Sequence, residues 1–171
     1  TDFVARNADF IKLGNDIIGK VVDRGVAPDA PELAAGVTEL ISTIKENMTI
    51  RRIEVLNKGR GEYIVDYIHG EGRIGVLVKA KSDKPEIFDS EKVKTFIFDC
   101  ALHIAAYSPL FLSEKDVNQD YLKDQEEIFT KQAENLGKPA NVLQGIIKGK
   151  LKKHLAEVCF LEQPFVKDDK R

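Results

Sequence analysis

The stretch that decides the fold is residues 63–80, which read YIVDYIHGEGRIGVLVKA. Residues 63–69 and 74–80 are rich in β-branched and aromatic residues, as strands are. The short link between them contains Gly70 and Gly72, and glycine readily adopts the positive φ angles of tight turns. The stretch therefore predicts two antiparallel strands joined by a short turn.

A third strand is expected before this pair. Ile50, Ile53, Val55 and Leu56 indicate a strand over residues 50–56, and the glycine-containing turn 58–61 would link it to the next one. Consecutive strands with short links form an antiparallel meander. The sequence therefore predicts a three-stranded antiparallel sheet.

Two helices are expected before the sheet in the sequence. Apolar residues recur at helical spacing over residues 8–24 and again over residues 31–47. Gly25 ends the first helix, while Pro28 and Pro31 mark the turn and the start of the second. These two helices are predicted to form a hairpin that lies on the sheet.

Three more helices are expected after the sheet. The first covers residues 90–107, with Ser90 as N-cap and Pro109 as its stop. Residues 116–136 and 140–159 form the other two, and the turn Gly137-Lys138-Pro139 makes them an antiparallel hairpin with a thin apolar seam. The second hairpin helix carries a basic run, Lys148–Lys153, whereas the first is rich in Asp and Glu. Opposite charges on two paired helices usually fix their pairing and register. RNA binding by the basic run is the alternative interpretation.

The predicted fold class is therefore α+β, with helices packed on small antiparallel sheets in two similar subdomains. The first subdomain would cover residues 1–82, with two helices and the three-stranded meander. The second would cover residues 83–171 and carry the helical hairpin at about 116–159. A chain of 171 residues is long enough for one domain or two small ones.

Composition narrows the function. A net charge of −2 does not favour a nucleic acid as main partner, and no apolar run approaches the ~18 residues that cross a membrane. Cys100 and Cys159 are expected to be buried thiols of a cytoplasmic protein. His103 and His154 lie on predicted helices outside any motif and are assigned structural roles. The sequence shows no metal-ligand spacing, cofactor motif or catalytic triad, so we expect no cofactor, no metal and no membrane contact.

Residues 70–75, GEGRIG, match the dinucleotide-binding pattern G-x-G-x-x-G. That pattern requires a helix to open at its end, so that the phosphates meet the helix N-terminus. Here Ile74, Val76 and Val78 continue as a strand. We therefore interpret the glycines as a hairpin turn, and a nucleotide-binding enzyme remains a rival hypothesis that a GDP or NAD titration would test.

The first seven residues, Thr1-Asp2-Phe3-Val4-Ala5-Arg6-Asn7, carry the clearest interaction signal. Asp2 or Asn7 can cap the helix that follows. Phe3, if it points outward, is an aromatic anchor for a pocket in a partner.

This N-terminal stretch resembles the signature of elongation factor Ts, the guanine-nucleotide exchange factor of the translational GTPase elongation factor Tu. Further similar motifs follow in order: Ile44–Asn47 with Ile50-Arg51-Arg52, then His69-Gly70 with Arg73–Val78, and Gln163–Val166. The resemblance covers essentially the whole chain. It also implies that the predicted helical hairpin protrudes and serves dimer formation or partner contact.

The resemblance implies exchange by protein–protein binding, without covalent chemistry. Phe3 would wedge between helices beside the nucleotide site of elongation factor Tu, in its GDP-bound and nucleotide-free forms, with Asp2 assisting. Ile44 and His69 would belong to the same contact surface, His69 helping to grip the GTPase. Because the chain starts within a motif and lacks an initiator Met, we expect a piece of a longer protein. The alternative function is a dimerisation module that has no exchange activity by itself and can form a homodimer.

Overall fold

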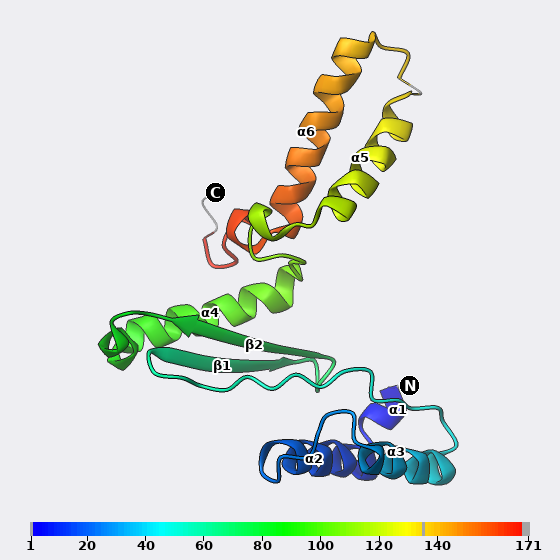
Figure 1. Cartoon of the computed structure of the whole chain (residues 1–171), viewed down its shortest axis with the longest axis vertical. Helices are drawn as coiled ribbons and strands as arrows, with labels where there is room; N and C mark the ends of the chain where they lie inside the picture. The colour runs from blue at the N-terminus through cyan, green and yellow to red at the C-terminus, as the bar shows by residue number, and fades with distance from the viewer. Residues whose placement is uncertain (1, 135, 169–171) are drawn as a thin grey trace. The chain divides into compact units, whose positions relative to one another are not determined.

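The structure is a computed structural model that describes residues 2–134 and 136–168, so Thr1 of the N-terminal signature lies outside the described residues (Figure 1). The α-helices and strands run in the order α1 (Asp2–Ala5), α2 (Ala8–Val22), α3 (Pro31–Ile44), β1 (Glu62–His69), β2 (Ile74–Lys81), α4 (Glu91–Tyr107), α5 (Gln119–Glu134) and α6 (Ala140–Val158). Three 3₁₀ turns are Pro85–Asp89, Glu114–Asp116 and Phe160–Glu162. The predicted α+β class is confirmed, and each of the five long helices lies within its predicted range.

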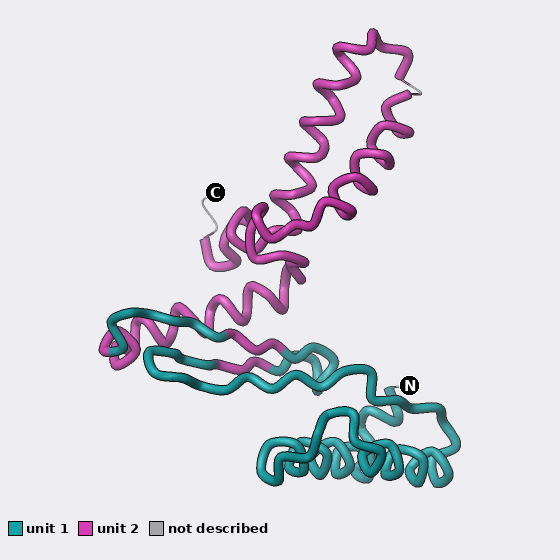
Figure 2. Tube along the Cα trace, viewed as in Figure 1, with its two compact units in different colours: residues 1–64, 68–75, 79–85 teal, residues 65–67, 76–78, 86–171 magenta. Residues whose placement is uncertain are grey.

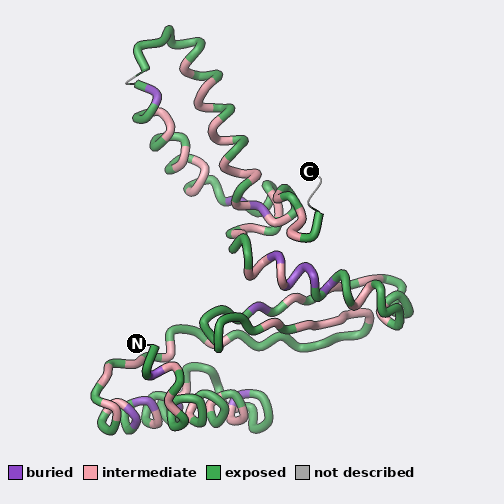
Figure 3. The backbone as a smooth tube through the Cα atoms, turned by 180° about the vertical axis from the view of Figure 1, so that it is seen from behind, coloured by how far each residue is buried: buried purple, intermediate pink, exposed green. Residues whose placement is uncertain are grey.

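The chain divides into two compact units (Figure 2). Unit 1 comprises residues 1–64, 68–75 and 79–85, and unit 2 comprises residues 65–67, 76–78 and 86–171. The middle of each strand therefore groups with the second unit. Each unit has buried apolar residues of its own (Figure 3).

The sheet contains two strands, β1 and β2, among the described residues. The prediction of a third strand over residues 50–56 is wrong, because that stretch has no regular secondary structure. Its apolar residues do not keep the two-residue alternation of a half-buried strand: Ile50 and Ile53 would point to opposite faces, and Val55 and Leu56 are adjacent. Val55 and Leu56 are both exposed, so the stretch lacks the buried face that would fix a pairing register.

In unit 1, α2 and α3 pack against each other. The Asn7 side chain accepts hydrogen bonds from the backbone N–H groups of Asp9 and Phe10, at 2.8 and 3.2 Å. Of the two capping candidates, Asp2 and Asn7, it is therefore Asn7 that caps α2. On α3, Leu33, Val37 and Leu40 are buried at the spacing of one helix face.

In unit 2, α4 buries Ile97, Cys100, Ala101 and His103. Burial raises the pKa of the Cys100 thiol and also that of Cys159. Both thiols are free and buried, as the sequence indicates. They act as small apolar groups of the core.

The helices α5 and α6 pair as the predicted hairpin, and residue Gly137 between them has φ 60°. Helical spacing over residues 116–136 places Ile128 on the apolar stripe of the first hairpin helix. In the structure Ile128 is 45% exposed, whereas Ala133 is fully buried. The ring of Phe129 packs edge-on against His154 of α6, with centroids 5.8 Å apart, so the Phe129–Ala133 face turns toward α6. The Tyr121 hydroxyl lies 2.8 Å from His154 Nε2 and adds a polar link between the helices.

Candidate functional site

The candidate site begins at α1, a single turn of helix at the start of unit 1. Its Phe3 side chain is 90% exposed, while the next residue, Val4, is only 6% exposed. The backbone N–H of Asn7 donates to the Val4 carbonyl at 2.9 Å, which closes the helix before α2 begins. One buried side chain therefore holds the turn in place while its aromatic neighbour points away from the unit.

Two ion pairs join this segment to the turn between β1 and β2. Arg73 Nη2 lies 2.8 Å from Asp2 Oδ2, and Arg6 Nη2 lies 2.7 Å from Glu71 Oε2. The four side chains are more than half exposed, and ion pairs of this kind contribute about 0–1 kcal/mol each. The two pairs matter for position more than for stability. They attach Asp2 and Arg6, which flank Phe3, to residues 71 and 65 positions later in the chain.

The turn itself is fixed by its backbone. Gly70, Glu71 and Gly72 have φ angles of 60°, 58° and 91°, and the Arg73 N–H donates to the Gly70 carbonyl at 3.3 Å. Glycine adopts positive φ without steric cost, whereas Glu71 does so against its usual preference. The G-x-G-x-x-G match is therefore a hairpin turn followed by a strand, as interpreted from the sequence.

The four predicted contact residues fall at three places in unit 1. Asp2 and Phe3 lie on α1, His69 ends β1 directly before the turn, and Ile44 ends α3. Asp2, Phe3 and His69 are exposed, and Ile44 is half buried. The ion pairs bring Asp2 to the turn that follows His69, and they do not involve Ile44.

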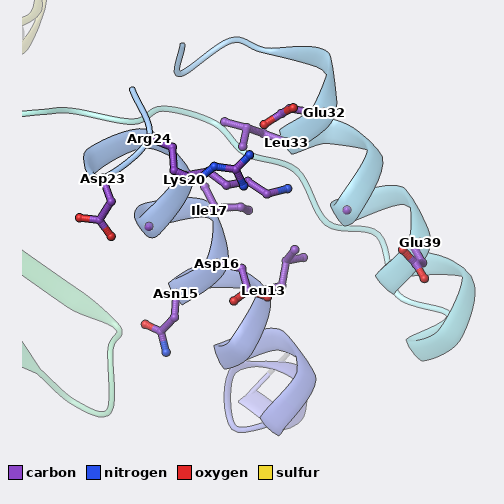
Figure 4. A pocket seen from close by; sticks show the side chains of 12 residues that line it. Leu13, Asn15, Asp16, Ile17, Lys20, Asp23, Arg24, Glu32, Leu33 and Glu39 are labelled. Carbon is purple, nitrogen blue, oxygen red and sulfur yellow. The ribbon is translucent and has the colours of Figure 1, made fainter. Parts of the chain in front are cut away.

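A groove of about 570 Å³ lies between α2 and α3 in the same unit (Figure 4). Lys20 from α2, Arg24 from the turn that follows it, and Glu32 and Glu39 from α3 line the groove. These charged side chains are exposed or half buried, so water screens them. The groove is a feature of helix packing, and we assign no ligand to it.

Residues 2–134 and 136–168 contain no group of three or more His, Cys, Asp or Glu side chains placed to hold a metal ion. Within the same residues, every helix is too short or too polar to cross a bilayer.

A family model described as elongation factor TS matches residues 1–171, the full length of the chain. The chain belongs to the elongation factor Ts family. It is 49% identical over 170 residues to elongation factor Ts of Treponema denticola, covering 99% of this chain and 61% of that protein. Elongation factor Ts of Borrelia recurrentis is 47% identical over 99% of this chain and 62% of that protein. Elongation factor Ts of Borreliella burgdorferi is 44% identical over 99% of this chain and 61% of that protein.

The chain thus spans about three-fifths of the length of these elongation factor Ts relatives. The match places the chain in a family of translation elongation factors, in agreement with the resemblance that the N-terminal signature carries. Arg6, Glu71 and Arg73 were not among the residues predicted for the site. The signal that would have found them is the opposite charge of Asp2 and Arg73, and of Arg6 and Glu71, within two motifs of the same family signature.

Proposed function

We propose that this chain promotes guanine-nucleotide exchange on elongation factor Tu through α1 and the turn 70–73, with elongation factor Tu as its cytoplasmic partner. The observation that carries the proposal is Phe3, whose ring is 90% exposed beside the buried Val4. Aromatic side chains are enriched among the residues that dominate binding energy, and here the ring is presented on a fixed turn of helix. Membership of the elongation factor Ts family supports elongation factor Tu as the partner.

The mechanism is mechanical. The Phe3 ring inserts between helices beside the nucleotide site of the GTPase, and their displacement disturbs the magnesium and phosphate contacts that hold GDP. Asp2 and Arg73 keep α1 in the orientation that the insertion requires, because they are paired at 2.8 Å. His69 and Ile44 enlarge the contact surface from β1 and α3.

Energetics require more than one contact. Weakening nucleotide affinity a thousandfold takes about 4 kcal/mol of coupling free energy. Burying one phenylalanine side chain contributes about 1.5–3 kcal/mol. Phe3 therefore supplies a large share, and His69, Ile44 and their neighbours supply the remainder. The coupling is reciprocal, so saturating GDP lowers the affinity of the GTPase for this chain by the same factor.

The test is the rate of fluorescent GDP release from elongation factor Tu with the Phe3→Ala chain. From the burial free energy above, the exchange rate should fall about tenfold or more. Ile18→Ala is a matched control, because Ile18 is an exposed apolar residue on α2 of the same unit. Equal release rates for Phe3→Ala and the unaltered chain would remove Phe3 from the mechanism.

Self-association through the helical hairpin is the second candidate function. Its supporting observation is the exposure of Ile128 on α5 and of Val142 on α6, which leaves apolar surface on the hairpin after the two helices have paired. Sedimentation of the chain and of Ile128→Asp, over a range of concentrations, tests it. A monomer at every concentration for the unaltered chain refutes this function.

A further inference from the structure

The C-terminal segment Gln163–Lys167, which we call the strap, contacts α4 mainly through His103, while Lys167 pairs with Asp99 and Phe165 also packs on Phe96. The His103 side chain is 1% exposed. Its Nε2 lies 2.9 Å from Gln163 Oε1, and the Val166 backbone N–H donates to its Nδ1 at 3.1 Å. The ring also stacks on Phe165, with centroids 5.8 Å apart.

The hydrogen bonds define which ring nitrogen carries the proton. A backbone N–H can only donate, so Nδ1 must be the acceptor and hold no proton. Gln163 is oriented by its Nε2, which donates to the Glu157 carbonyl at 2.6 Å, leaving Oε1 to face the histidine. The proton of the neutral ring is therefore on Nε2, where it donates to Gln163.

We infer that His103 is a proton-sensitive latch, whose neutral imidazole fastens Gln163 and Val166 of the strap to α4 and whose protonation weakens that attachment. Protonation places a hydrogen on Nδ1, and the Val166 N–H then faces a donor instead of an acceptor. It also puts a positive charge on a ring that is enclosed by Tyr107, Phe160 and Phe165. The lost acceptor is the effect that favours release of the strap, since a buried donor without an acceptor is costly. The aromatic faces stacked on the imidazole offset part of the cost of burying its charge.

Other titratable groups on the surrounding elements do not replace this lost acceptor. The Asp99 carboxylate on α4 is engaged with the Lys167 ammonium of the strap itself, 2.6 Å away. Cys100 on α4 and Cys159 beyond α6 remain neutral thiols, because burial raises the pKa of each. The remaining groups are the Tyr107 hydroxyl, Glu157 on α6 and Glu162 in the 3₁₀ turn, and both glutamates are exposed. As the pH falls, the strap should therefore follow the charge of the imidazole.

The test is amide hydrogen exchange of Val166 in the whole chain, measured by NMR and corrected for the intrinsic rate. As the pH is lowered from about 7.5 to 5.5, Val166 should lose protection while amides in the middle of α4 keep theirs. The loss can reach about tenfold per pH unit, because one proton is linked to release. Constant protection of Val166 overturns the latch, and so does a parallel loss in α4, which would indicate unfolding of unit 2.

Two substitutions sharpen the test. His103→Asn provides an amide oxygen near the position of Nδ1 that accepts a hydrogen bond at any pH in this range. Protection of Val166 should then be independent of pH, and a retained pH dependence would assign the effect to another group. His154→Asn is the matched control, because His154 belongs to the same unit but bonds to Tyr121. Its Val166 profile should equal that of the unaltered chain, and loss of the pH dependence in this variant would also overturn the latch.

Discussion

Neutralising either Asp2 or Arg73 is predicted to slow nucleotide exchange, and swapping the two charges between these positions is predicted to restore it. The two side chains are paired at 2.8 Å and are 74% and 58% exposed. An ion pair this exposed contributes about 0.2–1 kcal/mol, which corresponds to at most about a fivefold change in rate. Asp2→Asn and Arg73→Gln should therefore each slow GDP release by up to that factor, well below the effect of Phe3→Ala.

The assay is fluorescent GDP release from elongation factor Tu at low and at high salt. The double variant Asp2→Arg with Arg73→Asp should recover the original rate within about twofold, since the pair is re-formed with its signs reversed. High salt should reduce the effect of both single substitutions, because exposed charges are screened. Removing the pair between Lys12 and Asp16, which is 2.9 Å long and similarly exposed on α2, should leave the rate unchanged.

A double variant as slow as the single ones would refute this reasoning. Asp2 would then contact the GTPase itself, where a reversed charge meets the wrong partner. The result thus separates positioning of α1 by the ion pair from direct recognition by Asp2.

Three further predictions concern stability, each measured by chemical denaturation followed by circular dichroism. Leu33→Ala should lower the free energy of unfolding by about 2–5 kcal/mol, because Leu33 is 1% exposed; a loss below about 1 kcal/mol would contradict its place in the core. Gly61→Ala should also destabilise, by about 1 kcal/mol or more, since an added Cβ would lie 2.6 Å from the Ser82 carbonyl oxygen at a φ of 73°, and a neutral effect would contradict this geometry. Tyr121→Phe removes the hydroxyl bonded to His154 and should cost about 1 kcal/mol, and an unchanged midpoint would show that this link between α5 and α6 contributes nothing.

Much of the fold is local enough to be predicted from the sequence. The helix α2 begins after Asn7, whose side chain caps it, and α4 begins after Ser90, which has the predicted N-cap position but makes no side-chain capping hydrogen bond. Both helices end near a glycine or proline, and their apolar residues repeat at helical spacing. The prediction of a strand over residues 50–56 was wrong, because the content of β-branched residues favoured a strand while the order of apolar and polar residues did not alternate as a strand requires. Similarly, Ile128 and Phe129 are adjacent apolar residues on α5, and only the partner helix decides which of them faces the seam.

The site was predictable in part. The sequence marks Phe3 as a candidate anchor, but its exposure depends on Val4 occupying the buried position next to it. Asp2 could be assigned a capping role from sequence, whereas the structure pairs it with Arg73, 71 residues later. An ion pair between distant residues depends on the fold bringing β1 and β2 back to α1, which no local pattern contains. The roles of Ile44 and His69 remain predictions.

The arrangement at α1 explains how so short a helix can present an exposed Phe3 ring. A four-residue helix has almost no intrinsic stability in water, so its conformation must be imposed from outside. The buried Val4 anchors α1 in unit 1, and Asn7 caps α2 directly after it. The ion pairs of Asp2 and Arg6 attach α1 to the turn between β1 and β2. Because these constraints act through backbone and neighbouring side chains, the Phe3 ring itself makes no contribution that folding needs. Its exposed apolar surface therefore retains nearly all of its burial free energy for a partner, which is the property that an exchange factor acting by insertion requires.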